Sequence, residues 1–174
     1  MGRCTTSFIL VTGGCGFLGS NFVRYAARNH PDIQILVLDS LTYAGNASNL
    51  PADFPNVDLI VGDICDPQTT DSLVLFADAV VNYAAETHND NSINEPTPFL
   101  HSNVEGTFNL IEACRKYDVR YHHISTDEFF CVLIRSIAVR AIADCCSQAI
   151  GSNPSFYQQI RSRFSCTIRT RRPI

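Results

Sequence analysis

The sequence has no apolar run long enough to cross a lipid bilayer. Its longest apolar stretch, Leu73 to Ala85, is interrupted by Asp78 and Asn82, whereas a membrane-spanning helix needs about 20 apolar residues. The first seven residues contain no separate apolar segment that would act as a secretion signal. We therefore expect no contact with a membrane and a cytoplasmic location.

Excess positive charge and paired metal-binding cysteines are also missing. The formal net charge is −4, so the composition indicates no general affinity for nucleic acid. Eight cysteines are present, but none forms the C-x-x-C pairs that commonly hold zinc. We interpret them as reduced thiols and expect no metal site.

What the sequence does have is a glycine-rich loop directly after an apolar run. Phe8 to Val11 is apolar, and the loop that follows it places Gly13, Gly16 and Gly19 at intervals of three residues. A strand, a loop and a helix in this order leave backbone N–H groups at a helix N-terminus, where a pyrophosphate can approach closely. Glycines also serve ordinary turns, so the spacing alone does not decide between the two uses.

An acidic residue follows the loop at the distance that a dinucleotide site requires. Asp39 ends a second apolar run, Ile33 to Leu38, about twenty residues beyond the loop. A carboxylate at this point accepts hydrogen bonds from the ribose hydroxyls of NAD and repels the 2′-phosphate of NADP. The alternative is a solvated aspartate at a strand end. The order of strand, loop, helix and acid favours an NAD site.

The rest of the pattern predicts an α/β fold, a Rossmann-like doubly wound parallel sheet. Further strands are expected at 57–61, 79–85 and 119–125, and helices at 67–76 and 98–117. On the last helix, apolar residues recur at spacings of three and four, which indicates one face packed against the sheet. Those residues are Phe99, Leu100, Val104, Phe108, Ile111 and Cys114.

The composition changes abruptly after Glu128. Residues 1–128 carry sixteen acidic and six basic side chains, whereas residues 129–174 carry one acidic side chain and seven arginines. We expect residues 1–128 to form an NAD-binding domain that is incomplete at its C-terminus, and residues 129–174 to be an atypical basic tail. A shift of reading frame near residue 129 is the simplest origin of the tail. An arginine-rich nucleic-acid patch is the alternative, but no recognisable binding fold accompanies it.

Thr126, Asp127 and Glu128 follow the strand expected at 119–125, at the sheet edge where ligands bind in open α/β folds. Adjacent carboxyl groups can hold different protonation states when their environments differ, so they can act as an acid and a base. These three residues are therefore candidates for catalysis. The alternative is an ordinary polar turn between a strand and a loop.

Six segments resemble the extended short-chain dehydrogenase/reductase superfamily and, within it, the dTDP-glucose 4,6-dehydratases. The segments Leu41–Asn46 and Ser125–Glu128 are typical of the dehydratases, whereas the glycine loop is common to the superfamily. The likeness covers roughly residues 7–128. The matching segments are Val11–Ser20, Leu38–Asn46, Gly62–Asp66, Ala84–His88, Asn103–Thr107 and His122–Glu128.

The resemblance implies a nucleotide-sugar substrate and an NAD that is reduced and regenerated within one turnover, which converts dTDP-glucose to dTDP-4-keto-6-deoxy-glucose. Asp127 then corresponds to the acid that protonates the departing C6 hydroxyl, and Glu128 to the base that removes the C5 proton. Thr126 would hydrogen-bond the sugar near C4, and Thr87 would also contact substrate. The resemblance gives His88 a role in ordering a loop or contacting substrate rather than in catalysis.

The resemblance also implies cofactor contacts along four loops, one for each part of NAD. They are Gly13, Gly16, Phe17, Leu18 and Gly19 at the pyrophosphate, Asp39, Ser40, Leu41 and Thr42 at the adenosine ribose, Asp63 and Ile64 at the adenine, and Tyr83, Ala84, Ala85 and Thr87 on the nicotinamide side. The family forms homodimers, but the helices of the usual dimer face lie partly in the altered region. The sequence therefore leaves the oligomeric state open.

The sequence departs from the superfamily after Glu128. The superfamily places a lysine four residues after its catalytic tyrosine, where it lowers the tyrosine pKa. Here Lys116 is the single lysine, and Tyr157 is followed by Arg161. A planar guanidinium does not replace an ammonium group that bridges tyrosine and ribose. We therefore expect a chain that binds NAD but does not turn over substrate.

Three alternatives stay open. The chain could be a related nucleotide-sugar epimerase or decarboxylase, which Asp127 and Glu128 disfavour. It could be a non-catalytic NAD-binding or partner-binding protein, which the missing lysine favours. Finally, a sequencing error could conceal an active full-length enzyme.

Overall fold

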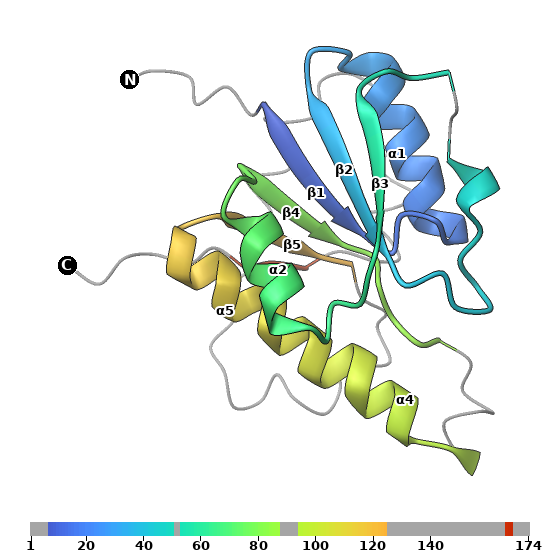
Figure 1. The fold of residues 1–174 in the computed structure, drawn as a ribbon, viewed down its shortest axis with the longest axis vertical. Coiled ribbons are helices and arrows are strands. Elements are labelled where there is room, and N and C mark those ends of the chain that lie inside the picture. Colours follow the sequence, from blue (N-terminus) through green and yellow to red (C-terminus); the bar gives the residue numbers. More distant parts are fainter. Residues whose placement is uncertain (1–6, 51–52, 88–93, 125–165, 169–174) are drawn as a thin grey trace.

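The computed structural model describes residues 7–50, 53–87, 94–124 and 166–168 (Figure 1). A parallel sheet forms its centre, with spatial order β3-β2-β1-β4-β5. The chain starts in the middle of the sheet, builds outward to β3 and then crosses to the other side, so the predicted doubly wound α/β fold is confirmed. The strands are β1 (Phe8–Thr12), β2 (Gln34–Asp39), β3 (Val57–Val61), β4 (Ala79–Asn82) and β5 (Arg120–His123).

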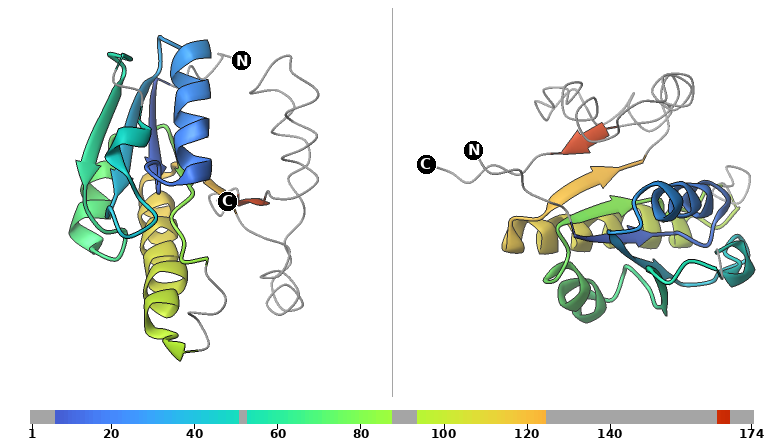
Figure 2. Two further views of the ribbon diagram at one scale, coloured as in Figure 1. Left: turned by 90° about the vertical axis from the view of Figure 1, so that its right-hand side faces the viewer. Right: turned by 90° about the horizontal axis from the view of Figure 1, so that it is seen from above.

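Helices cover both faces of the sheet (Figure 2). On one face α1 (Phe17–Asn29) packs Val23 and Ala27 against Val11 and Val37 of the central strands. On the other face lie α2 (Pro67–Val74) and a continuous helical run made of α4 (Thr97–Phe99), the π-helical segment η2 (Leu100–Gly106) and α5 (Thr107–Tyr117). A short 3₁₀ helix, η1 (Ala47–Asn49), follows β2. No helix in the described ranges has both the length and the apolar character that crossing a membrane would require.

The helix expected at 98–117 is present, but the face predicted to be buried is partly wrong. Leu100, Val104 and Phe108 are 62%, 53% and 61% exposed. The helical run instead packs closely at Gly106, where a Cβ would lie 2.5 Å from the Ile64 side chain. The buried residues of η2 and α5 are Gly106, Leu110, Ala113 and Cys114.

A further strand, β6 (Cys166–Ile168), pairs antiparallel with the outer edge of β5. It lies within residues 129–174, which we expected to be an atypical basic tail. The outer edge of β5 would otherwise present unpaired N–H and C=O groups, which any extended segment can pair with. The other residues of the predicted tail lie outside the described ranges.

The carboxyl ends of the parallel strands meet at one edge of the sheet. Thr12 at the end of β1 is in register with Leu38 in β2 and with Asn82 in β4. β4 ends at Asn82 rather than at the expected Ala85, since the Asn82 side chain accepts the N–H of Ala84 at 3.1 Å and turns the chain away from the sheet. The loops that leave this edge build the candidate site.

Candidate functional site

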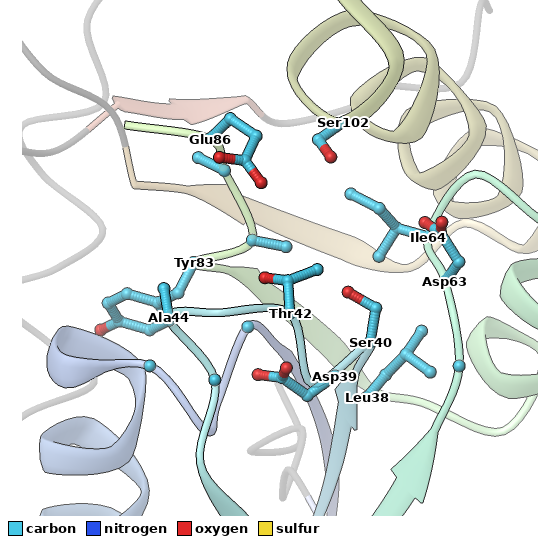
Figure 3. Close-up of a pocket in the computed structure, with 16 residues that line it drawn as sticks. Leu38, Asp39, Ser40, Thr42, Ala44, Asp63, Ile64, Tyr83, Glu86 and Ser102 are labelled. Carbon is cyan, nitrogen blue, oxygen red and sulfur yellow. The ribbon is translucent and has the colours of Figure 1, made fainter. Parts of the chain in front are cut away.

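A pocket opens at the carboxyl edge of the sheet, between the loops after β1, β2, β3 and β4 and the start of the helical run (Figure 3). Asp63 and Ile64 lie beside Ser102, on the opposite side from Ala44 and Tyr83. Many of the residues predicted to bind cofactor line this pocket. They are Gly13, Gly16, Asp39, Ser40, Thr42, Asp63, Ile64, Tyr83, Ala84 and Ala85.

The three glycines of the predicted spacing have different structural reasons. Gly13 has a φ of +67°, and a Cβ there would lie 2.5 Å from the backbone nitrogen of Ala84. At Gly19 a Cβ would overlap the carbonyl oxygen of Gly13, so this glycine allows α1 to pack onto the loop. Gly16 has room for a Cβ, whose nearest neighbour would be 3.4 Å away. The fold therefore does not require glycine at position 16. The remaining reason for a glycine there is the close approach of a ligand.

The N-terminus of α1 is suited to binding an anion. Its N-cap is Gly16, which offers no side-chain hydrogen bond, and the first turn contains no acidic residue. The first N–H groups of a helix have no intrahelical partner, and the helix dipole makes this end partly positive. Gly16 also lines the pocket, so these groups lie where a phosphate could accept their hydrogen bonds.

Asp39 is fixed between two loops. One carboxylate oxygen accepts the N–H of Cys15 at 2.8 Å and the other accepts the N–H of Leu41 at 2.9 Å. The residue is only 8% exposed, so the alternative of a solvated aspartate is wrong. A carboxylate has about four lone-pair directions, which leaves acceptor capacity for a ligand. Burial, and next the charge of Asp39, raise the pKa of the Cys15 thiol to about 11.

A buried polar network joins the ends of β1, β4 and β5 beneath the pocket. The Thr12 hydroxyl donates to the Asn82 side-chain oxygen at 2.5 Å, and the Asn82 amide donates to the Tyr121 hydroxyl at 3.0 Å. His123 Nδ1 lies 3.0 Å from the same hydroxyl. Burial raises the pKa of Tyr121 and lowers that of His123. This network fixes the position at which β4 delivers the chain to the pocket.

Two side-chain contacts attach the loop after β4 to its surroundings. The Asn103 side chain accepts the N–H of Glu86 at 2.8 Å and donates to the Glu86 carbonyl at 2.9 Å, which links the loop to η2. The Tyr43 hydroxyl donates to the Glu86 carboxylate at 2.9 Å, and this pair is exposed to solvent. Burial and this carboxylate raise the pKa of Tyr43. The loop is thus held at its backbone by η2 and at its side chain by the loop after β2.

Some predicted cofactor residues do not line the pocket. Phe17 and Leu18 are exposed at the start of α1, Gly19 is buried under the loop, Leu41 adopts a φ of 51° beside Asp39, and Thr87 is exposed. Conversely, Ser102 lines the pocket although it was not predicted. The sequence feature that could have identified Ser102 is its position directly before the matching segment Asn103–Thr107.

The predicted catalytic residues Thr126, Asp127 and Glu128 lie outside the described residues, as do His88 and Tyr157. The strand that leads to the catalytic segment is described. β5 runs parallel to β4, and the N–H of Ile124 bonds to the Asn82 carbonyl at 3.0 Å. The chain therefore reaches residue 124 at the same sheet edge as the pocket.

Residues 9–135 match the NAD dependent epimerase/dehydratase family. The dTDP-glucose 4,6-dehydratase of Mycobacterium tuberculosis (strain ATCC 25618 / H37Rv) is 52% identical over 122 residues, which is 70% of this chain and 37% of that protein. The crystal structure of DesIV, a dTDP-glucose 4,6-dehydratase from Streptomyces venezuelae with NAD and TYD bound, superposes with a TM-score of 0.60 at 43% identity, over 64% of this chain and 37% of that one.

The dTDP-glucose 4,6-dehydratase from Bacillus anthracis str. Ames in complex with NAD gives a TM-score of 0.62 at 36% identity, over 70% of this chain and 38% of that one. This chain thus spans well under half the length of the relatives that it matches.

Proposed function

The chain belongs to the NAD dependent epimerase/dehydratase family, and we propose that its residues 1–128 bind NAD as the cofactor half of a dTDP-glucose 4,6-dehydratase. The observation that carries the proposal is the pairing of an uncapped helix N-terminus at Gly16 with the buried carboxylate of Asp39 on one pocket. The first suits a pyrophosphate and the second a ribose diol. The likeness to solved dehydratases that contain NAD supports the same assignment.

The residues of the pocket fit the parts of a dinucleotide. The backbone between Gly13 and Gly19 would hold the pyrophosphate, because the space at Gly16 admits close approach. Asp39 would accept hydrogen bonds from the hydroxyls of the adenosine ribose, and Asp63 would accept one from the adenine amino group. Tyr83 to Thr87 would face the nicotinamide side. When bound, NAD supplies the group that accepts hydride from the sugar and returns it.

The substrate class and the acid–base roles follow from the resemblance. The relatives named above are dTDP-glucose 4,6-dehydratases, which supports a nucleotide sugar as the substrate. Glu128 would take the C5 proton, Asp127 would give a proton to the departing C6 hydroxyl, and Thr126 would hydrogen-bond the sugar near C4. Because β5 leads to the pocket edge, it would deliver these residues to the side of the pocket that the nicotinamide faces.

We also propose that this chain does not complete the reaction by itself. Oxidation at C4 needs a proton acceptor, and Tyr157 has Arg161 instead of lysine four residues later. General-base catalysis contributes on the order of a hundred- to ten-thousand-fold. Incubation of the full chain with dTDP-glucose and NAD should therefore give no 4-keto-6-deoxy product above background, and Tyr157→Phe should change nothing. Turnover by the full chain that disappears in Tyr157→Phe would overturn the proposal that the chain does not complete the reaction.

NAD binding is tested without any turnover. Saturation with NAD should raise the thermal unfolding midpoint of the full chain, since a ligand at a hundred times its Kd adds about 2.7 kcal/mol. The matched variant is Gly16→Ala, whose Cβ would meet no atom closer than 3.4 Å in the fold but would lie where the pyrophosphate approaches. The shift should therefore shrink or vanish in Gly16→Ala. An equal shift in both proteins would show that NAD does not use this loop.

The division of the chain near residue 128 is part of the same proposal. A variant that ends at Glu128 should bind NAD as the full chain does, because all of the described residues that line the pocket precede that position. The antiparallel strand β6 pairs with β5, so its removal should lower the stability of the sheet edge rather than the affinity. Loss of NAD affinity at unchanged thermal stability would assign part of the cofactor site to residues 129–174.

A further inference from the structure

A second group of polar side chains lies where the loop after β3 meets η2. Asp63 and Cys65 come from the loop and His101 from η2, and a ligand atom of each lies within 4.8 Å of the other two. We propose that Asp63, Cys65 and His101 form a binding site for a divalent transition-metal cation of the zinc type. The expectation of no metal site was based on cysteine spacing, which does not detect ligands from distant segments.

The His101 ring is held in the orientation that a metal ligand needs. Its Nδ1 lies 2.8 Å from the Glu105 carboxylate one turn later, and its Nε2 lies 3.8 Å from an oxygen of Asp63. When Nδ1 donates its proton to Glu105, Nε2 carries a lone pair that faces the Asp63 carboxylate. Metal-binding histidines almost always donate their other ring N–H to a carboxylate, a backbone carbonyl or water. A cation between the two acceptors would satisfy both.

Asp63 and Cys65 are also positioned by their surroundings. One oxygen of Asp63 accepts the N–H of Cys65 at 2.9 Å, which orients the carboxylate and leaves the other oxygen toward His101. The Cys65 sulfur is buried against η2 and donates to the His101 carbonyl at 3.1 Å. Gly106 permits this close approach, because a Cβ there would lie 3.1 Å from the sulfur.

The ligand set selects the class of metal. Thiolate and imidazole favour zinc and similar ions over magnesium and calcium, which prefer oxygen ligands. Zinc lies about 2.0–2.3 Å from such ligands, so neighbouring ligand atoms in a tetrahedral site are about 3.3–3.7 Å apart. The ligand atoms, which lie within 4.8 Å of one another, would have to close to this range by side-chain rotation. Binding would release the Cys65 thiol proton to solvent, and water would complete the coordination.

The proposed site shares Asp63 with the cofactor pocket, so a bound cation and the adenine of NAD would use the same carboxylate. This consequence rests on the proposed function, whereas the cation site itself does not. Metal binding is therefore measured without nucleotide. If the chain bound no cation, the proposal that it binds NAD would still stand. If it bound no NAD, the proposal of a cation site would still stand.

The test is a titration of the reduced full chain with Co²⁺, followed by displacement with Zn²⁺. We expect one equivalent to produce a thiolate-to-cobalt charge-transfer band and the intense visible bands of four-coordinate cobalt. Cys65→Ser should abolish the charge-transfer band, and His101→Gln should weaken the affinity about tenfold or more. Glu105→Gln should weaken it about tenfold, as loss of a ligand-orienting carboxylate typically does.

Two matched variants test one other cysteine and one other histidine. Cys114→Ala removes a buried cysteine of α5 and His30→Gln removes the histidine at the end of α1, and both should retain the cobalt spectrum. Circular dichroism checks that each variant is folded, and the exposed His101 keeps the test valid if Cys65→Ser fails to fold. A charge-transfer band and affinity that persist unchanged in both Cys65→Ser and His101→Gln would overturn the proposal.

Discussion

The two walls of the pocket are built in different ways. On one wall, β1, the glycine loop, α1 and β2 follow one another along the chain, and Asp39 bonds back to Cys15 only 24 residues earlier. On the other wall, Glu86 is held by Asn103, and Asn82 is held by Thr12 and Tyr121. The first wall is a local motif, whereas the second is assembled from segments that are distant in sequence. The comparison predicts which substitutions damage the fold and which damage only one wall.

The largest loss of stability is expected where the two walls of the pocket touch. Gly13→Ala places a Cβ 2.5 Å from the Ala84 nitrogen and forces a non-glycine residue to a φ of +67°. Such overpacking and backbone strain should lower the free energy of unfolding by about 2–4 kcal/mol, measured by urea denaturation. Gly16→Ala is the matched control, because its Cβ meets nothing closer than 3.4 Å. A stability loss as large in Gly16→Ala would contradict this account of the loop.

Asp39→Asn should break the local wall more selectively. The amide keeps one acceptor but turns its NH₂ toward one of the N–H groups of Cys15 and Leu41, which would leave that buried donor unpaired. The expected loss in the free energy of unfolding is about 1–3 kcal/mol. The substitution also removes the charge that opposes a 2′-phosphate, so the ratio of NAD to NADP affinity should fall. An unchanged ratio would mean that Asp39 does not contact the ribose.

Asn103→Ala should loosen the non-local wall. It removes two hydrogen bonds to the backbone of Glu86, which should cost about 1–2 kcal/mol in urea unfolding. Tyr43→Phe is the control on the same glutamate. The Tyr43 hydroxyl makes a solvent-exposed hydrogen bond to the Glu86 side chain. Tyr43→Phe should therefore change the free energy of unfolding by less than about 0.5 kcal/mol. Equal effects of the two substitutions would show that the backbone link to η2 is not what holds this loop.

The last prediction is a pH dependence of stability that arises from β5. Burial lowers the pKa of both His122 and His123, and the neighbouring His122 lowers that of His123 further. The unfolded chain therefore binds protons that the folded chain does not as the pH falls below about 6.5. Stability should be retained above that pH and decline below it, by at most about 1.4 kcal/mol per pH unit for each histidine. His123→Gln should reduce the slope between pH 6.5 and 5, and an unchanged slope would exclude this residue as a cause.

The same contrast explains how much could be predicted from the sequence. The succession of strands and helices along the chain, the glycine loop and the place of Asp39 at the end of β2 were predicted, because each depends on residues that are close in sequence. The exposure of Leu100, Val104 and Phe108 was not predicted, because the helical run packs closely at Gly106 against Ile64, a residue distant in sequence. Ser102 was missed because η2 reaches the pocket only through tertiary packing. The cluster of Asp63, Cys65 and His101 was missed for the same reason, since its members meet only after η2 packs against the loop that follows β3. The roles of Thr126, Asp127 and Glu128 stay predictions.

The most direct test of the central claim is calorimetric titration of the full chain with NAD and, separately, with NADP. The account predicts that NAD binds at about one site per chain and that NADP binds about tenfold or more weakly, because the buried Asp39 carboxylate opposes a 2′-phosphate. NADP binding as tight as NAD binding, or no binding of either, would contradict it.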